Sequence, residues 1–192
     1  MNPADRSTGL SDLATCRVLW RRDLLAKRAG MHASARAESD HAISIALTEH
    51  LAHVEGVLGF YWPIQHEFDA RPAVTTWLAA SPSRRAVLPV VVKRAAPLKF
   101  RQWTPGTAMQ SAGFGTSVPA TGDWIDPDAL LVPLVGFDDQ RYRLGYGGGY
   151  YDRTLAALPR RPATVGIGFK ICRLESIEPQ SYDLKLDRLV LG

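Results

Sequence analysis

The apolar runs of this 192-residue chain are short, and their length limits which folds it can adopt. Residues 86–92 and 129–135 form runs of about seven residues interrupted by proline, whereas a membrane-spanning helix needs about 20 apolar residues. Short apolar runs bounded by turn residues are typical of buried strands. Since 46% of the residues are hydrophobic, the chain can bury the core of one domain. We expect one domain over residues 1–192, with residues 1–10 as a flexible tail and no membrane segment.

Segments with helical periodicity alternate with these runs. Ser11 is the expected N-cap of the first helix. The expected helices cover residues 11–29, 35–53, 70–80 and 150–158, and the expected strands cover residues 57–62, 86–92, 98–103, 130–135, 163–169 and 188–191. Between them, residues 104–128 are rich in proline and glycine and are expected to be mostly loop. This alternation predicts the α/β class, with a mostly parallel central sheet flanked by helices on both faces.

The most distinctive motif is RLGYGGGYYD at residues 143–152, between an expected buried strand and an expected helix. Ligands of open α/β sheets bind beyond the carboxyl ends of the strands. Glycine lets backbone N–H groups approach an anion, and a following helix adds the positive end of its dipole. Arg143 supplies a forked donor for phosphate and Asp152 an oxygen for Mg²⁺. The motif therefore predicts a phosphate-binding loop.

The motif fits neither of the common nucleotide patterns. The Gly-Lys-Ser/Thr of the Walker pattern is missing, and Tyr150 stands where the dinucleotide pattern has its third glycine. Glycines alone would also suit a structural tight turn, and that reading stays open.

Charge and cysteine content narrow the function classes. The formal net charge is +4, but the basic residues are scattered and no nucleic-acid reading motif is present, so we expect no nucleic-acid partner. The two cysteines, Cys16 and Cys172, are too few for a disulfide framework. The N-terminal residues do not have the pattern of a secretory signal. We therefore expect a cytoplasmic protein.

Residues 131–138 (LVPLVGFD), followed after four residues by residues 143–152, resemble the signature of the 5-formyltetrahydrofolate cyclo-ligase (5,10-methenyltetrahydrofolate synthetase) family. Shorter matches occur in the family's order over most of the chain. They include Arg17 with Arg21, residues 61–72 and residues 98–103, and the last is at residues 179–183.

The resemblance implies a three-layer fold like that of sugar-phosphate isomerases and CoA transferases. It implies ATP-dependent conversion of 5-formyltetrahydrofolate to 5,10-methenyltetrahydrofolate, with ATP and Mg²⁺ as cofactors and release of ADP and phosphate. The formyl oxygen would be phosphorylated by ATP, and N10 of the folate would then close the ring. Such an enzyme is expected to be a monomer that acts on a small molecule, either free or polyglutamylated.

The resemblance also assigns roles to individual residues. Arg143 and Tyr151 are the candidate catalytic residues. Trp62, Glu67 and Tyr151 would bind the folate, and Asp152 and Asp183 would bind the metal. The nucleotide would be held by Arg17, Arg21, Arg143, Leu144, Gly145, Tyr146, Gly147, Gly148, Gly149, Tyr150 and Tyr151.

The chain departs from the family pattern at four positions. Arg17 and Gly148 replace lysines that are common in the family, which gives Arg143 and Mg²⁺ more of the task of neutralising phosphate. Tyr182 stands where histidine is expected and Val118 where glutamate is expected. The second of these leaves the role of residues 106–122 open.

Each candidate also has a purely structural reading. Arg17 and Arg21 could be solvated helix charges, Glu67 could cap the helix that begins near residue 69, and Asp152 could favour a helix N-terminus. Other structural readings are a turn carboxylate for Asp183, core packing for Trp62 and Trp103, surface histidines for His50 and His53, and a turn for Asp126 and Asp128. At the level of function, the alternatives are a non-catalytic nucleotide- or phosphate-binding module on the same scaffold and a basic RNA-associated protein.

Overall fold

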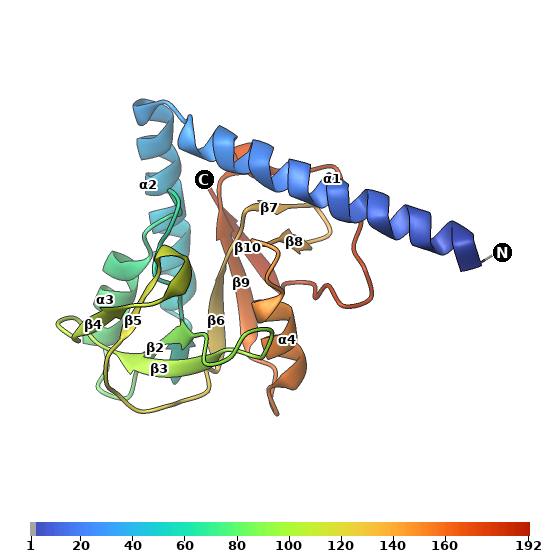
Figure 1. Ribbon diagram of the computed structural model, residues 1–192. Coiled ribbons are helices and arrows are strands. Elements are labelled where there is room, and N and C mark those ends of the chain that lie inside the picture. The colour runs from blue at the N-terminus through green and yellow to red at the C-terminus, as the bar shows by residue number, and fades with distance from the viewer. Residues whose placement is uncertain (1–2) are drawn as a thin grey trace.

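The computed structural model describes residues 3–192, the side chains of residues 3–11 and 114 excepted (Figure 1). Its helices are α1 (Pro3–Ala29), α2 (Ala33–Leu51), α3 (Arg71–Ala79) and α4 (Tyr150–Ala157), with 3-10 turns η1 (Gly113–Gly115) and η2 (Lys170–Cys172). Its strands are β1 (Val57–Gly59), β2 (Arg85–Val90), β3 (Lys99–Trp103), β4 (Met109–Ser111), β5 (Ser117–Pro119), β6 (Ala129–Pro133), β7 (Gly136–Phe137), β8 (Arg143–Leu144), β9 (Ala163–Gly168) and β10 (Arg188–Leu191).

Six strands form the central sheet in the order β10-β9-β6-β1-β2-β3. All neighbouring pairs are parallel except β2 with β3, so the predicted mostly parallel sheet is confirmed. From β1 the chain moves to β2 on one side, and it later returns to place β6 on the other side. The order therefore reverses between β1 and β6, where open α/β sheets bind their ligands.

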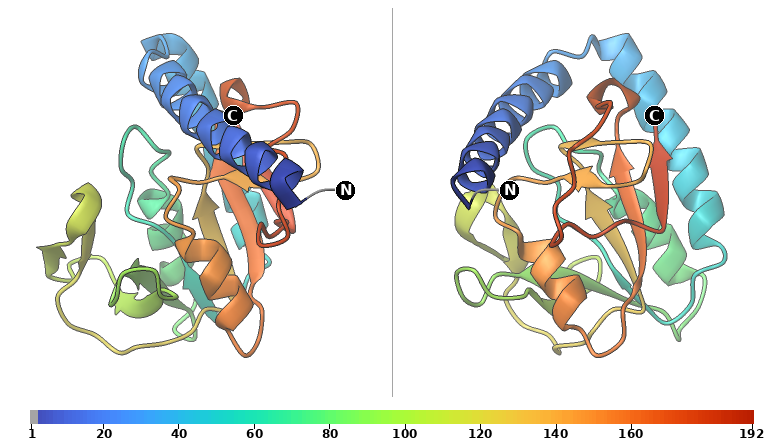
Figure 2. Two further views of the ribbon diagram at one scale, coloured as in Figure 1. Left: turned by 45° about the vertical axis from the view of Figure 1, so that its right-hand side comes forward. Right: turned by 90° about the vertical axis from the view of Figure 1, so that its right-hand side faces the viewer.

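Helices cover both faces of the sheet, as predicted. On β2, Ala86 and Leu88 face the core that also contains residues of α2 and α3, whereas Val87 faces a second core that includes Leu155 of α4. The alternation follows from the two-residue period of a strand. Figures 1 and 2 show α2 and α3 on one side of the sheet and α4 on the other. The more specific likeness to sugar-phosphate isomerases and CoA transferases stays a prediction.

The first helix differs from its prediction at the N-terminus. α1 begins at Pro3, so Ser11 lies inside the helix and the prediction that it is the N-cap is wrong. Proline is tolerated in the first turn of a helix, and the segment from Pro3 to Ser11 holds no later proline that would stop it. The expected tail at residues 1–10 lies partly outside the described residues, and its described part belongs to α1.

Four strands (β1, β2, β6 and β9) end earlier than expected, and the predicted loop contains a hairpin. β1 ends at Gly59 although the apolar run continues to Trp62, and β6 ends at Pro133. Residues 60–62 stay largely buried after they leave the ladder, so burial alone extended the predicted strand. After β6, the chain forms the short antiparallel pair β7–β8. Within the expected loop 104–128, β4 and β5 also pair.

Within residues 3–192, no helix combines the length and the apolar character that crossing a bilayer requires.

Candidate active site

The sequence-predicted site residues gather mainly where the sheet order reverses. Tyr61, Trp62 and Glu67 follow β1, and the glycine-rich residues 145–149 follow the β7–β8 pair that continues from β6. α1 crosses both segments, because Arg21 contacts the glycine-rich loop and Arg28 contacts the chain beyond β1 and β6. Parallel strands therefore bring residues distant in sequence to one edge of the sheet.

The glycine-rich loop has the backbone conformation that its glycines permit. Gly147 and Gly149 have φ angles of +92° and +62°, a region that residues with a Cβ rarely adopt. Gly149 is the N-cap of α4 and provides no side chain to cap it. Within the described part of the chain, none of the five N–H groups of residues 145–149 donates a hydrogen bond. The loop thus offers unpaired donors beside a helix N-terminus, an arrangement that suits an anion.

Arg21 lies against this loop. Its Nε donates to the Gly145 carbonyl at 2.7 Å, and its Cζ would lie 3.3 Å from a Cβ built on Gly147. Burial lowers the pKa of Arg21, the charge of Arg17 lowers it further, and that of Asp183 opposes them. Arg21 is therefore no freely solvated charge.

Arg17 lies on the same helix but binds another segment. Arg17 is 7% exposed, and its guanidinium donates to both carboxylate oxygens of Asp183, at 2.5 and 3.3 Å, and to the carbonyls of Ile177 and Glu178. The solvated reading of Arg17 is wrong. Asp183 also accepts from the N–H of Gln180 at 2.7 Å, so it stabilises a turn as well as pairing with Arg17.

Arg143 and Asp152 form a bidentate ion pair. Nη1 and Nη2 of Arg143 donate to Oδ1 and Oδ2 of Asp152 at 2.8 and 2.9 Å, and Arg143 is 7% exposed. Asp152 stands in the first turn of α4, where its charge also suits the helix dipole. The N–H of Leu184 donates to Asp152 at 3.4 Å, which brings the segment of Asp183 beside it. The predicted phosphate ligand and the predicted metal ligand thus pair with each other.

Glu67 is buried, with 7% of its surface exposed. Its Oε2 accepts from the N–H of Ile64 at 2.9 Å, and its Oε1 accepts from the hydroxyl of Tyr146 at 2.7 Å. Burial raises the pKa of Glu67 although these bonds and Arg28 oppose the shift. The helix-cap reading is wrong, because the N-cap of α3 is Ala70 and the two oxygens of Glu67 accept from Ile64 and Tyr146.

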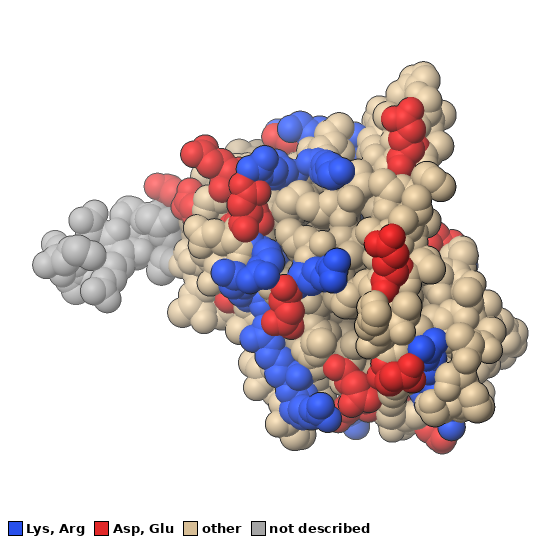
Figure 3. All heavy atoms as spheres, turned by 180° about the vertical axis from the view of Figure 1, so that it is seen from behind, with Lys and Arg blue, Asp and Glu red and all other residues tan. Residues whose placement is uncertain are grey.

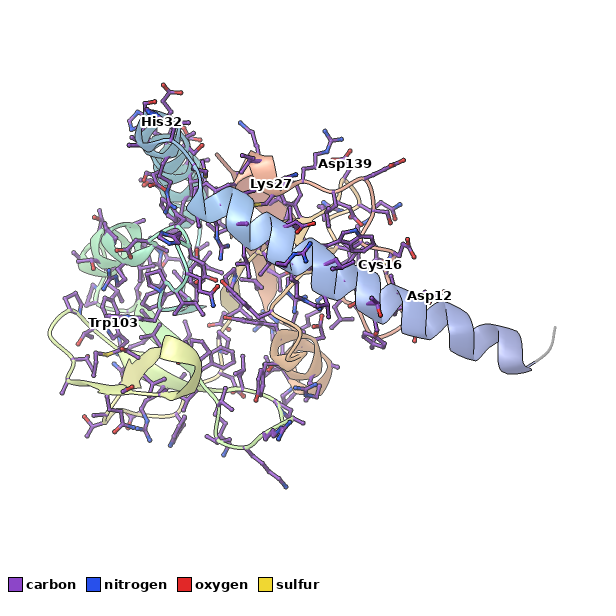
Figure 4. All side chains as sticks on the ribbon, turned by 45° about the horizontal axis from the view of Figure 1, so that its top comes forward. Asp12, Cys16, Lys27, His32, Trp103 and Asp139 are labelled. Carbon is purple, nitrogen blue, oxygen red and sulfur yellow. The ribbon has the colours of Figure 1, made fainter. Side chains whose placement is uncertain are left out.

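Two tryptophans, Trp62 and Trp103, line a groove. Trp62 is half-buried under the guanidinium of Arg71, which lies 4.5 Å from the ring centre. Trp103 is 5% exposed and packs edge-on against Phe60, so its core reading is confirmed. In Figure 4, Trp103 lies beside the β4–β5 hairpin, and Cys16 and Lys27 mark the course of α1. The groove has a volume of about 390 Å³ and is lined by Trp62, Asp69, Arg71, Pro72, Thr75, Trp103 and Pro105.

Tyr151 is half-buried beside Arg143, whose guanidinium lies 5.6 Å from the centre of its ring. Burial, and after it the charge of Glu67, raises the pKa of Tyr151, so the hydroxyl stays protonated at neutral pH.

Sequence reasoning missed Arg28. It is 2% exposed and donates to the carbonyls of Gln65 and Leu134 at 3.0 and 2.9 Å and to the hydroxyl of Tyr146 at 2.8 Å. It therefore joins the segment after β1, the segment after β6 and the glycine-rich loop. Its spacing could have indicated this role, because residues 17, 21, 24 and 28 follow one another at intervals of four, three and four and therefore lie on one helix face.

No group of three or more acidic, histidine or cysteine side chains that could hold a metal occurs among the described residues. Figure 3 shows basic and acidic side chains interspersed on the face seen from behind.

Comparison with known proteins identifies relatives. The model of the 5-formyltetrahydrofolate cyclo-ligase family matches residues 15–192. The chain is similar to the cyclo-ligases of Haemophilus influenzae (32% identity, 50% of this chain and 54% of the relative) and Mycolicibacterium smegmatis (38% identity, 55% and 59%). It thus spans little more than half the length of these two relatives. A solved 5,10-methenyltetrahydrofolate synthetase from Mycoplasma pneumoniae shares the fold, with a TM-score of 0.74 and 24% identity over 91% of this chain and 97% of that one. The chain belongs to the 5-formyltetrahydrofolate cyclo-ligase family.

Proposed function

We propose that this chain converts 5-formyltetrahydrofolate to 5,10-methenyltetrahydrofolate, with use of ATP and release of ADP and phosphate. Family membership supports the reaction class. The observation that carries the proposal is the 2.7 Å hydrogen bond between Tyr146 and Glu67. It joins the loop expected to hold the nucleotide to the carboxylate expected to hold the folate, so the two substrates would meet at one edge of the sheet.

The reaction needs a better leaving group than the formyl oxygen. In the first proposed step, the formyl oxygen attacks the γ-phosphorus of ATP. The bond from that phosphorus to the bridging oxygen breaks, and ADP leaves. N10 then attacks the formyl carbon and loses its proton, and the carbon–oxygen bond breaks to release phosphate. The protein has to position the reactants and neutralise charge, and no nucleophilic side chain is required.

The residues of the chain have distinct roles in this proposal. The unpaired N–H groups of residues 145–149 donate to the terminal phosphates, and Arg21 stays beside them. Arg143 exchanges Asp152 for phosphate oxygens, and Arg17 adds positive charge from α1. Tyr151, with its hydroxyl protonated, donates a hydrogen bond near the reacting oxygen. Glu67 accepts hydrogen bonds from the pterin, and Trp62 lines its pocket.

The carboxylates of Asp152 and Asp183 are ligands of the type that magnesium prefers, because Mg²⁺ is usually held by one or two carboxylates together with phosphates. The Leu184–Asp152 contact brings their segments together, and the two side chains are 18% and 11% exposed. Arg143 and Arg17 would have to turn away from them. A bound Mg²⁺ would supply charge neutralisation at the phosphates.

We further propose that the enzyme is a cytoplasmic monomer that accepts free or polyglutamylated folate. The two cysteines, one of them buried, suit a reducing compartment.

The test combines the purified protein with ATP, Mg²⁺ and 5-formyltetrahydrofolate and follows both methenyl absorbance and released phosphate. We expect both products in equal amounts, and only when ATP and the folate are present together. A non-catalytic nucleotide-binding module would bind ATP without forming either product, and that result would overturn the proposal.

A further inference from the structure

A buried network ties the glycine-rich loop to Glu67. The hydroxyl of Tyr146 donates to Oε1 of Glu67 at 2.7 Å and accepts from Nη2 of Arg28 at 2.8 Å. Glu67 and Arg28 are 7% and 2% exposed, whereas Tyr146 itself is 39% exposed. The tyrosine therefore reaches from a surface loop to a buried carboxylate 79 residues away in the sequence.

Both oxygens of Glu67 already accept a hydrogen bond. The bond from the N–H of Ile64 to Oε2 is local, spans three residues and belongs to the fold of the segment after β1. The bond from Tyr146 to Oε1 joins residues 79 positions apart, and Tyr146 stands between two glycines, which leave the backbone free to rotate. A ligand that donates N–H groups to Glu67 would therefore displace Tyr146 more readily than Ile64.

Few other contacts hold the loop. Within the described residues, the hydrogen bonds to the backbone of residues 145–148 come from Arg21 to the Gly145 carbonyl and from Arg153 to the Gly148 carbonyl. A Cβ built on Gly145 would meet nothing within 4 Å. The bond from Tyr146 to Glu67 ties the loop to a buried side chain, and without it the glycines of the loop would let the backbone rotate toward a phosphate.

Arg28 would keep the walls of the site in place when Tyr146 leaves. Its bonds to the carbonyls of Gln65 and Leu134 involve neither the tyrosine nor the loop.

We propose that Tyr146 is a positioning residue that couples the two substrates: folate displaces it from Glu67, and the released loop then closes on the nucleotide. The inference rests on the proposed function, because it takes the pterin as the ligand of Glu67. Both ligands bind better to the protein with Tyr146 released, so each strengthens the binding of the other.

Calorimetry on the full chain tests the coupling. The dissociation constant of a non-hydrolysable ATP analogue with Mg²⁺ is measured without and with saturating 5-formyltetrahydrofolate. In the wild type, the folate should tighten analogue binding about tenfold, within the usual range of coupling between two sites. In Tyr146→Phe, the folate alone should bind about tenfold more tightly, since it no longer competes with a hydrogen bond to a charged group, and the coupling should fall to about onefold. Wild-type coupling in this variant, or weaker folate binding, would overturn the proposal.

Tyr142→Phe is the matched control. Tyr142 lies just before β8, and within the described residues its hydroxyl forms no hydrogen bond. This variant should keep the wild-type coupling. Loss of coupling in it as well would show a general effect of tyrosine replacement and would also overturn the proposal.

A second measurement needs no ligand and separates this inference from the proposed function. The NMR order parameters of the Gly147 and Gly148 amides should fall below about 0.6 in Tyr146→Phe and stay near the wild-type value in Tyr142→Phe. Unchanged order parameters in Tyr146→Phe would overturn the anchoring role even if the enzyme is active. If the wild type fails to bind 5-formyltetrahydrofolate, the proposed function fails, and with it the coupling.

Discussion

The two ends of the parallel strands both place arginines beside aspartates, but they hold them differently. At the carboxyl ends, the side chains of Arg143 and Asp152 are 4% and 18% exposed, and two hydrogen bonds of 2.8 and 2.9 Å join them. At the amino ends, Arg160 is 88% exposed and lies 3.8 Å from Asp128. Solvent screens the attraction between Arg160 and Asp128. Burying the charge of Arg143 costs free energy of solvation, and the ion pair with Asp152 offsets that cost.

Cavity volume does not distinguish the groove at the amino ends from the groove beside Trp62. The groove at the amino ends has about 380 Å³ and the groove beside Trp62 about 390 Å³. The difference lies in the burial and bonding of the charged groups. Charge that is buried and held in one geometry can change partner when a ligand enters, and for this reason we propose that the chemistry takes place at the carboxyl ends.

The largest expected effect comes from removing the buried arginine. Arg143→Ala should lower kcat/KM about 1,000-fold, because it removes a forked donor to the phosphates and leaves Asp152 unpaired. The methenyl assay measures the loss, and circular dichroism confirms that the variant is folded. Arg160→Ala should change kcat/KM less than about twofold. Similar losses in the two variants would erase the contrast between the ends of the sheet.

A smaller effect is expected in the glycine-rich loop. Gly147→Val should weaken binding of the ATP analogue about 100-fold, since the side chain would meet Arg21 and obstruct the backbone donors. Gly106→Val is the matched control, because Gly106 has a similar φ of +90° and open space around it. The control bears the same backbone strain outside the site and should keep its affinity in calorimetry. Equal weakening in both variants would mean that strain alone, and not the loop's donors, determines binding.

The smallest effect is a difference in pH dependence between two carboxylates. Burial raises the pKa of Glu67 above its ordinary 4.5, so its contribution to stability is complete below that value and is lost as the pH rises through the raised pKa. Glu67→Gln should therefore gain Tm relative to the wild type as the pH rises from about 4 to about 8.

Asp187, at the amino ends, should show the opposite trend. Burial tends to raise its pKa, but hydrogen bonds from Thr164 outweigh burial and lower the pKa below 3.8. Its contribution is present above that value and is lost as the pH falls through the lowered pKa. Asp187→Asn should lose Tm relative to the wild type near neutral pH and approach it in acid. Thermal unfolding across this range checks both variants, and trends of the same sign would contradict the assignment.

The sequence was sufficient to predict the α/β class and most of the helices and strands, because strand and helix periodicities are local properties. It did not distinguish the glycines of the loop, of which Gly147 and Gly149 have positive φ angles and Gly145 and Gly148 do not. It misplaced the end of β1, because residues 60–62 are apolar and largely buried without belonging to the strand.

The contacts of the site were less accessible from the sequence. Arg17 meets Asp183 across 166 residues, and nothing local specifies that partner. Arg28 was overlooked because the leucines defined the expected helix, although its spacing from Arg21 places it on the same face. Arginines that share a helix face with a buried leucine, as Arg17 and Arg28 do with Leu24, indicate buried arginines.

We propose that the unpaired N–H groups of residues 145–149 hold the terminal phosphates of ATP beside the folate. A crystal structure with the non-hydrolysable analogue, Mg²⁺ and 5-formyltetrahydrofolate tests it most directly. We predict phosphate oxygens within hydrogen-bond distance of these N–H groups, Arg143 turned from Asp152 to phosphate, and the pterin on Glu67. Density for the triphosphate elsewhere, such as beside Arg160 and Arg161, would contradict the claim.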